Sequence, residues 1–223
     1  MKNKYIAPAV LFVCIFLSAG CSRNARPQSR GASPVSDFSY DLSTGGEGVK
    51  ITGYTGKGGK VIIPSIIEGL PVVEIKGATL SIPYQGAFQG HPTSRNQYFP
   101  ANRITEITVP SSVTVIGPEA FQMNDNLVKV TLPDGIKVFE SALFNDCGKL
   151  TSVNLPAGLE IMDMYVFEKC GELNNLAIPA GIASITFIEG NPGYGNNFSF
   201  RGCGKLPLRT RQAVQNLGYP NEF

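Results

Sequence analysis

The chain of 223 residues is long enough for one domain of ordinary size, or for one domain with a tail. Its 43% of apolar residues, with 13 Phe and 8 Tyr, can form a core, while 25 Gly and 16 Pro favour short strands joined by frequent turns. Without Lys2 and Lys4, which belong to an expected export signal, 17 acidic residues balance the remaining basic ones, and the lack of a basic stripe excludes a nucleic-acid-binding function.

Residues 1–20 have the features of a secretory signal peptide. Two lysines precede an apolar run from Tyr5 to Leu17, too short to span a bilayer comfortably, and small residues follow it. The segment that ends at Cys21 resembles a lipobox, the processing site of bacterial lipoproteins, although Ser18 stands where that family usually has Leu. The resemblance implies that Cys21 carries the lipid and becomes the mature N-terminus. An uncleaved anchor or an ordinary secreted protein is the alternative.

Residues 21–37 are predicted to form a flexible tether, because they hold no aromatic residue before the next segment and only one large aliphatic, Val35. Residues 38–63 then alternate apolar and polar side chains around two glycine-rich turns, which predicts a small antiparallel β cap. The second turn, Gly56 to Gly59, does not have P-loop spacing and precedes a strand-like stretch. We expect a hairpin turn there and not a phosphate site.

Residues 64–206 carry a 23-residue repeat. Each unit has an aliphatic-x-x-aliphatic-x-aliphatic pattern before a proline, another aliphatic three residues after it and, in the first three units, Phe eleven residues after it. The prolines are Pro110, Pro133, Pro156 and Pro179, and the phenylalanines are Phe121, Phe144 and Phe167. The seven or so apolar positions of a unit stabilise it by roughly 10–20 kcal/mol when buried, whereas ordering its backbone costs about 1–2 kcal/mol per residue. One unit therefore cannot fold alone, and stacked units with parallel strands and a shared core are predicted.

These columns resemble the BspA-like leucine-rich repeats of bacterial surface and secreted proteins, from about Phe38 to Tyr219. The resemblance implies a right-handed leucine-rich-repeat solenoid with a parallel β-sheet, irregular or short helical segments, a β-hairpin cap and a short C-terminal helix. The asparagine column of the commonest leucine-rich repeat is absent, since its place is taken by Ser112, Gly135, Gly158 and Gly181. The polar or cysteine column of this subtype is instead found at Asn124, Cys147 and Cys170.

Residues 207–223 are predicted to be a capping helix and tail. Ala213, Val214 and Leu217 fall on one helical face, and Gly218 is a suitable helix stop. A short helix here would cover the open end of the stack.

Cys147, Cys170 and Cys203 each follow a phenylalanine by three residues. Equivalent positions in adjacent coils lie about 5 Å apart, so a Cys147–Cys170 disulfide is geometrically possible in an exported protein. Equivalent side chains point the same way, however, which favours buried free thiols, and both alternatives stay open. His91 is the only histidine, and the cysteine pattern offers no fourth zinc ligand. We expect neither a metal nor a cofactor.

Two inserts interrupt the repeat, one between Ile75 and Ile104 and the other between Ile185 and Phe198. Their candidate ligand-binding side chains are Tyr84, Arg95, Tyr98, Phe99, Phe187 and Tyr194. Both inserts begin in the same phase of the repeat, so we expect them to leave the same flank and to frame a shallow ledge, with roughly 19 Å between the two coils that carry them. Irregular terminal caps are the alternative.

These features predict a non-enzymatic lipoprotein of the cell envelope, in the outer membrane or at the cell surface. Its lipid anchor would hold it on the membrane while the repeats bind a protein or extracellular-matrix ligand, as the resemblance implies. A periplasm-facing lipoprotein that organises other envelope proteins is the alternative. An enzyme is disfavoured because any Ser-His-Asp or Cys-His arrangement would depend on His91 alone.

Overall fold

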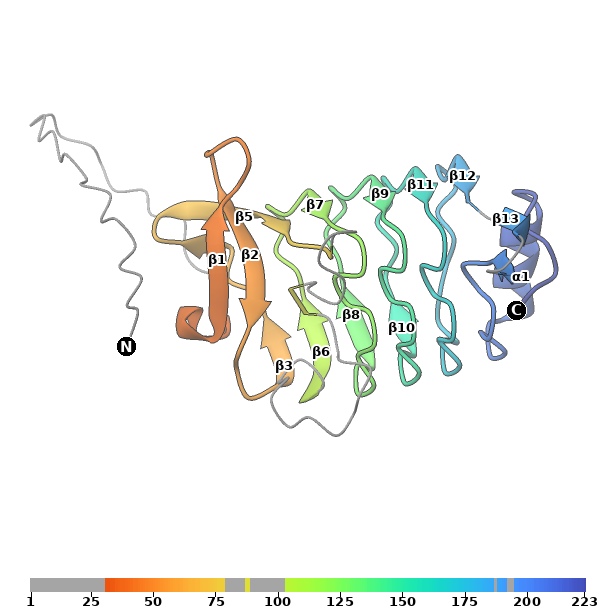
Figure 1. Ribbon diagram of the computed structural model, residues 1–223, viewed down its shortest axis with the longest axis horizontal. Helices are drawn as coiled ribbons and strands as arrows, with labels where there is room; N and C mark the ends of the chain where they lie inside the picture. Colours follow the sequence, from red (N-terminus) through yellow and green to blue (C-terminus); the bar gives the residue numbers. More distant parts are fainter. Residues whose placement is uncertain (1–30, 79–86, 89–102, 187, 192–194) are drawn as a thin grey trace, which may run out of the picture.

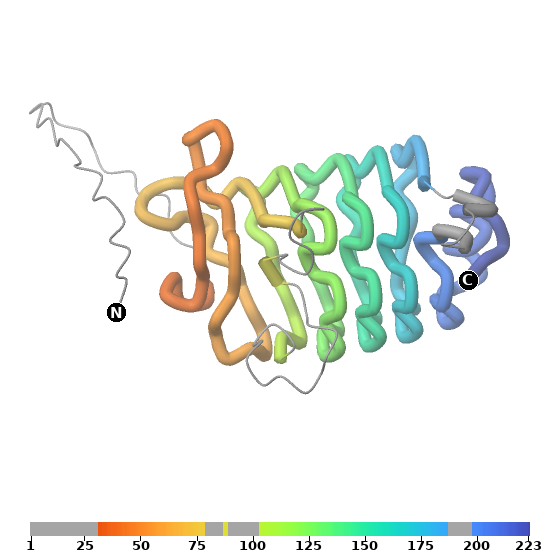
Figure 2. Tube along the Cα trace, in the orientation of Figure 1, coloured from red at the N-terminus to blue at the C-terminus, as the bar shows by residue number. Residues whose placement is uncertain are grey.

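A computed structural model describes residues 31–78, 87–88, 103–186, 188–191 and 195–223. The described chain winds into a stack of coils, and successive coils contribute strands to two parallel arrays on different sides of the stack. Figures 1 and 2 show the coils side by side in sequence order, from β1 at one end to α1 at the other. This arrangement is the leucine-rich-repeat solenoid that the 23-residue period predicts.

The first parallel array, sheet 1, contains the strands that precede the repeat prolines. Its members are β3 (Gly59–Ile62), β6 (Ile104–Thr108), β8 (Lys129–Thr131) and β10 (Ser152–Val153), and one bridge from Ser152 to Asn175 adds the next coil. Ile107, Val130 and Val153 lie in parallel register and are at most 2% exposed. The predicted parallel stacking of the repeats is therefore confirmed.

The second parallel array, sheet 2, lies on another side of the coils. Its strands form two hydrogen-bonded groups along the stack: β2 (Val49–Tyr54), β5 (Leu70–Ile75) and β7 (Val115–Ile116), and then β9 (Val138–Phe139), β11 (Ile161–Met162) and β12 (Ser184–Ile185). The last four recur every 23 residues, and each has a buried second residue behind a more exposed first one. This alternation follows from the two-residue period of extended backbone.

The N-terminal hairpin is present, but its extent differs from the prediction. β1 (Phe38–Leu42) pairs antiparallel with β2, and the two-residue β4 (Ile66–Ile67) pairs antiparallel with β5. β3, expected in the cap, pairs in parallel with β6 and belongs to the solenoid. The turn from Gly56 to Gly59 consequently joins sheet 2 to sheet 1, so the prediction of a hairpin turn is wrong.

Residues 31–37 are folded, although the sequence predicts a tether over 21–37. The Ser33 N–H donates to the Ile62 carbonyl at 2.8 Å, and the Ser33 hydroxyl accepts from the Ile62 N–H at 3.1 Å. The 3-10 turn η1 (Val35–Asp37) follows, and Val35 packs against the core. Ser33 thereby satisfies backbone groups at the edge of β3 that pairing would otherwise leave open. Residues 1–30 lie outside the described residues.

A ladder of phenylalanine rings fills the third side of the stack. Ring centroids lie 5.7 Å apart for Phe88–Phe121, 5.4 Å for Phe121–Phe144, 5.4 Å for Phe144–Phe167 and 5.7 Å for Phe167–Phe200. All five rings are fully buried. Phe88 and Phe200 keep their places although an insert lies near each of them, so the inserts do not interrupt the core.

The backbone of this third side uses a left-handed conformation at two positions of each repeat. The residues are Glu119, Ala142 and Tyr165 in one column and Met123, Asp146 and Lys169 in the other, with φ between 56° and 61°. Such a conformation costs a residue with a Cβ about 1–2 kcal/mol. It also directs N–H groups toward the carbonyls of the next coil, as from Phe144 to Val166 at 2.8 Å. These hydrogen bonds and the ring stacking offset the cost.

The C-terminal end is covered by α1 (Leu208–Gln215), as predicted. The residues that dock it differ, because Thr210 and Val214 are buried and Ala213 is only partly covered. The Thr210 hydroxyl donates to the Leu176 carbonyl at 2.7 Å and so satisfies a backbone group at the end of the stack. Gly218, with φ of 86°, follows the helix as its expected stop. The second insert contains the paired strands β13 (Ile188–Asn191) and β14 (Gly195–Asn197).

Candidate functional site

The side chains predicted to frame the ligand ledge lie outside the described residues. They are Tyr84, Arg95, Tyr98, Phe99, Phe187 and Tyr194. Cys21, the predicted lipidation site, and His91 lie outside them as well. The described structure supplies the frame for both inserts, because Phe88 and Phe200 belong to one continuous ring ladder.

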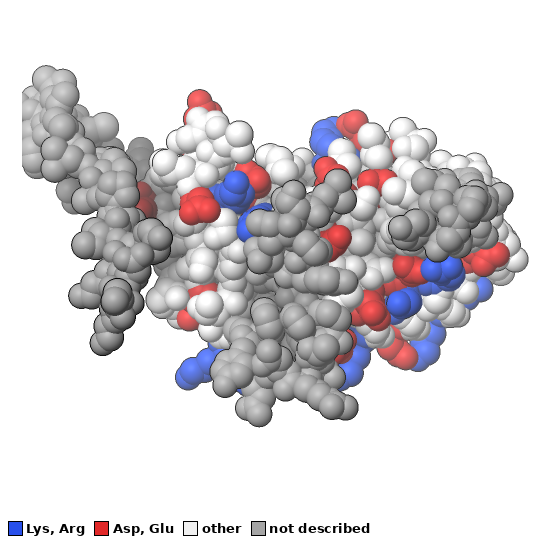
Figure 3. Space-filling model, viewed as in Figure 1, with Lys and Arg blue, Asp and Glu red and all other residues white. Residues whose placement is uncertain are grey.

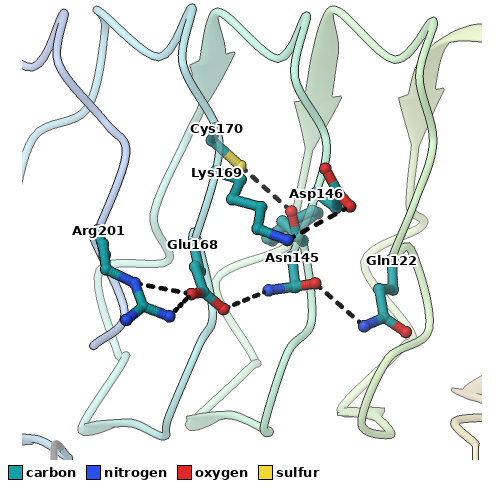
Figure 4. A network of polar contacts seen from close by, with 8 residues as sticks. Gln122, Asn145, Asp146, Glu168, Lys169, Cys170 and Arg201 are labelled. Atoms are coloured by element: carbon teal, nitrogen blue, oxygen red, sulfur yellow. Dashed lines mark hydrogen bonds and ion pairs between the residues drawn. The ribbon is translucent and has the colours of Figure 1, made fainter. Parts of the chain in front are cut away.

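A row of polar side chains runs along the third side of the stack, one from each coil, directly after the phenylalanines (Figure 4). Gln122 Nε2 donates to Asn145 Oδ1 at 3.1 Å, and Asn145 Nδ2 donates to Glu168 Oε2 at 2.9 Å. Glu168 Oε1 accepts from Arg201 Nε at 2.9 Å and also from a terminal guanidinium nitrogen. Because Glu168 is only 6% exposed, Arg201 balances a carboxylate that water hardly reaches. The row is named the polar ladder.

Sequence reasoning missed the polar ladder because its four positions hold four residue types. A repeat is recognised in a sequence by a residue type that stays constant, as the phenylalanines do. A column whose side chains change from amide to carboxylate to guanidinium does not show this signal. The usable signal is the spacing. Gln122, Asn145 and Glu168 follow one another at 23 residues, and Arg201 follows after a further 33 because the second insert adds ten.

The cysteine column faces the same interior. Each thiol donates to the carbonyl of the phenylalanine one coil earlier, at 3.0–3.1 Å: Cys147 to Phe121, Cys170 to Phe144 and Cys203 to Phe167. All three are free and buried, so the free-thiol alternative holds in this structure and the Cys147–Cys170 disulfide is not formed. Burial raises the pKa of Cys147 and of Cys203 to about 12, and the pKa of Cys170 also rises well above its usual value. Such thiols are poor nucleophiles.

The outer face of sheet 1 is polar. In register along its strands lie Lys60, Glu106, Lys129, Ser152 and Asn175. Lys60 Nζ lies 3.4 Å from a Glu106 carboxylate oxygen, and both side chains are well exposed, which makes this a weak surface ion pair.

The outer face of sheet 2 is apolar along its middle strands. Val115, Val138 and Ile161 occupy the outward position of β7, β9 and β11, and we name them the apolar row. Val115 is 51% exposed and Ile161 40% exposed. Glu74 lies in register with Val115 at one end, and Ser184 lies in register with Ile161 at the other.

Charged side chains of both signs are mixed over the molecule. Figure 3 shows acidic and basic groups interspersed on the face in view, with no large patch of one sign among the described residues there. Lys169 Nζ lies 3.9 Å from an Asp146 oxygen, and Lys205 pairs with Glu172 in the same region of the repeat. Exposed pairs of this kind contribute little to stability.

Two further classes of site were tested on the described part of the chain. No group of three or more His, Cys, Asp or Glu residues in it is placed to hold a metal ion. No helix in the same part is both long enough and apolar enough to cross a membrane.

Comparisons with known proteins agree on the repeat type. The sequence model of the BspA type leucine rich repeat region matches residues 93–189 with 6 copies. No curated protein matches the chain significantly. Among solved structures, the T. pallidum leucine rich repeat protein is 30% identical, with 86% of this chain and 98% of that chain covered and a TM-score of 0.47.

Two other solved structures share less sequence with the chain. A leucine rich cell surface protein from Faecalibacterium prausnitzii is 22% identical, with 69% of this chain and 44% of that one covered and a TM-score of 0.43. The pneumococcal vaccine antigen PcpA is 15% identical, with coverages of 67% and 48% and a TM-score of 0.39. The repeat family supports a protein-interaction or adhesion module, and family members of this kind are typically not enzymes. With six matched repeats and 30% identity over nearly the whole T. pallidum protein, the chain belongs to the BspA-type leucine-rich-repeat family.

Proposed function

We propose that the chain is a cell-envelope lipoprotein, held on a membrane by a lipid on Cys21, whose solenoid binds a protein or extracellular-matrix ligand. The ligand would lie on the ledge between the two inserts, against Tyr84, Arg95, Tyr98 and Phe99 on one side and Phe187 and Tyr194 on the other. Aromatic and arginine side chains are the types that contribute most to protein interfaces.

The observation that supports the ledge most is the unbroken ring ladder from Phe88 to Phe200. Four stacking contacts of 5.4–5.7 Å join these two rings, so the coils that carry the inserts belong to one packed core. Loops on a rigid frame lose less entropy on binding than loops on a mobile one. A broad solenoid surface also suits a macromolecular ligand better than a small molecule.

Binding to a decellularised extracellular matrix tests the ledge. We expect Tyr98→Ala combined with Tyr194→Ala to weaken binding by about tenfold or more, with an almost unchanged thermal midpoint. Tyr40→Ala in the N-terminal hairpin removes an aromatic outside the ledge and is the matched control. Equal affinities of the double variant and the control would contradict the ledge.

The anchor and the orientation need separate tests. Cys21→Ala should abolish incorporation of labelled palmitate and move the protein from the membrane fraction to the soluble fraction. Protease treatment of intact cells then separates the surface adhesin from the alternative, a periplasm-facing lipoprotein that organises envelope proteins. Only an outward-facing protein is lost from intact cells.

A further inference from the structure

The two sheets of the solenoid differ in what they present to solvent. At matching outward positions sheet 1 carries charged and polar side chains, as at Lys129 and Ser152, whereas sheet 2 carries the apolar row. Interior strands of both sheets, such as β8 in sheet 1 and β11 in sheet 2, are paired in parallel on both sides, so the preference of β-branched residues for strands applies equally to both. The difference therefore concerns the outer surface and not the formation of the strands.

The apolar row is regular along the stack. Ile161 lies in register with Val138, and Val115 precedes Val138 by one 23-residue repeat; Figure 1 shows β7, β9 and β11 in sequence along the same edge of the stack. Paired strands lie about 4.8 Å apart, whereas one turn of an α-helix rises about 5.4 Å. A helix laid along the row would place one turn against each coil, and over the two steps that separate the three coils the mismatch would be about 1.2 Å.

Charge differs on the two sides of the apolar row. On one side Lys137 and Glu160 form an ion pair with each other, which leaves that border neutral. On the other side Glu140 and Asp163 occupy equivalent, partly exposed positions of adjacent coils. Asp163 accepts hydrogen bonds from the Ser141 hydroxyl and from the Met164 N–H, and both donors are uncharged. Beside β9 and β11 this border therefore presents two negative charges that complement basic side chains, whereas the equivalent position beside β5 holds Lys76.

We propose that the outer face of sheet 2 is a docking surface for a basic amphipathic α-helix of a partner protein. Aliphatic side chains of the helix at i, i+4 and i+7 contact Val115, Val138 and Ile161, and lysine or arginine residues on one flank face Glu140 and Asp163. This surface is distinct from the ledge between the inserts, so the proposal does not depend on the ledge.

The test uses synthetic helical peptides of about four turns and the full chain. One peptide carries leucine along one face and lysine on one flank; a second has glutamate in place of lysine; a third is an isomer of the first with the helical period broken. We expect the lysine peptide to bind at least about tenfold more tightly than either control, by fluorescence anisotropy. Equal affinity for the lysine peptide and either control would overturn the proposal.

Two variants of the chain test whether the peptide binds at the outer face of sheet 2. Val115→Thr with Ile161→Thr keeps β-branching and should weaken binding by about tenfold. Val128→Thr is the matched control, because Val128 is 37% exposed and lies just before β8, away from the apolar row. Glu140→Lys should weaken binding without altering the apolar row, and it serves if the double variant unfolds. Unchanged binding in these variants, or a concentration-dependent dimer that the double threonine variant abolishes, would assign the surface otherwise and overturn the proposal.

Discussion

Glu168 and Arg201 join the last coil to the rest of the stack through a charged contact at a nearly buried carboxylate, with Arg201 Nε 2.9 Å from Glu168 Oε1. The Arg201 side chain is 46% exposed, whereas the Glu168 side chain is 8% exposed. Water therefore solvates the guanidinium in part but hardly solvates the carboxylate. Loss of the guanidinium would leave the carboxylate with only the Asn145 amide as a donor among the contacts of the polar ladder.

Arg201→Met should therefore lower the free energy of unfolding by about 1–3 kcal/mol, measured by urea denaturation. Lys205→Met is the matched control, because Lys205 pairs with Glu172 in the same two coils but both side chains are about half exposed. The control should cost less than about 1 kcal/mol. Equal losses in the two variants would show that burial of Glu168 does not govern the contact.

Lys169 and Lys149 should respond to glycine in opposite ways. Lys169 has φ of 61°, and the equivalent position of the next coil is Gly202 with φ of 83°. Lys169→Gly removes the strain of a left-handed Cβ, so we expect stability to stay unchanged or to rise by up to about 1 kcal/mol, whereas Lys169→Val should lose about 1–2 kcal/mol. Lys149→Gly should lose about 0.5–1 kcal/mol, because Lys149 is not among the left-handed residues. Thermal denaturation of the three variants compares them, and a loss at Lys169→Gly as large as that at Lys149→Gly would contradict the strain.

The sequence predicts those parts of the fold in which every coil needs the same residue type at the same position. The column of Phe144 is visible because a ring of that size fills the same space in every coil. Membership of β3 in sheet 1 was not predictable in this way, since its partner β6 follows a long insert. Thr210 docks α1 only because the finished stack leaves the Leu176 carbonyl open. The apolar row was not predicted, because its column is not one of the positions that define the repeat; Val115 stands beside the buried Ile116, and only the folded coil shows that half of Val115 faces solvent. The ledge side chains stay a prediction.

The cysteine column predicts a protein whose core thiols do not react until it unfolds. With pKa values raised to about 12 at Cys147 and Cys203 by burial, only about one molecule in ten thousand carries either thiolate at pH 8. The native protein is treated with a chromogenic disulfide reagent at pH 8, and guanidinium is then added to unfold it. Unfolding should let three more protein thiols react, seen as three further equivalents of the coloured product. Rapid labelling of these three positions in the native state would contradict their burial.

The same thiols give stability a dependence on alkaline pH. Their pKa is higher in the folded protein than the ordinary value of 9.0, so the unfolded chain loses its thiol protons first as pH rises. The stabilisation is fully present below about pH 9 and is lost as pH rises from there toward about 12. Urea denaturation at pH 8 and at pH 10 should show this loss, and Cys147→Ala with Cys203→Ala should make it smaller. An equal loss in the parent and the variant would assign the effect to other groups.

Tyr219 ends the hydrogen-bond pattern of the third side. In each earlier coil the N–H groups of this side donate to carbonyls of the following coil, but the last coil has no successor, and the Phe200 N–H donates to the Tyr219 hydroxyl at 2.8 Å. Burial raises the pKa of Tyr219, which keeps this phenol neutral at any ordinary pH.

Tyr219→Phe retains the ring but leaves a buried N–H without its acceptor, so it should cost about 1–3 kcal/mol and speed hydrogen exchange in residues 198–206 more than in the central coils. Tyr40→Phe loses only an exposed hydrogen bond to Glu68 and should change little. If exchange in the last coil is the same in both variants, the end of the stack is held by the packing of Phe200 against the Tyr219 ring and not by the hydroxyl.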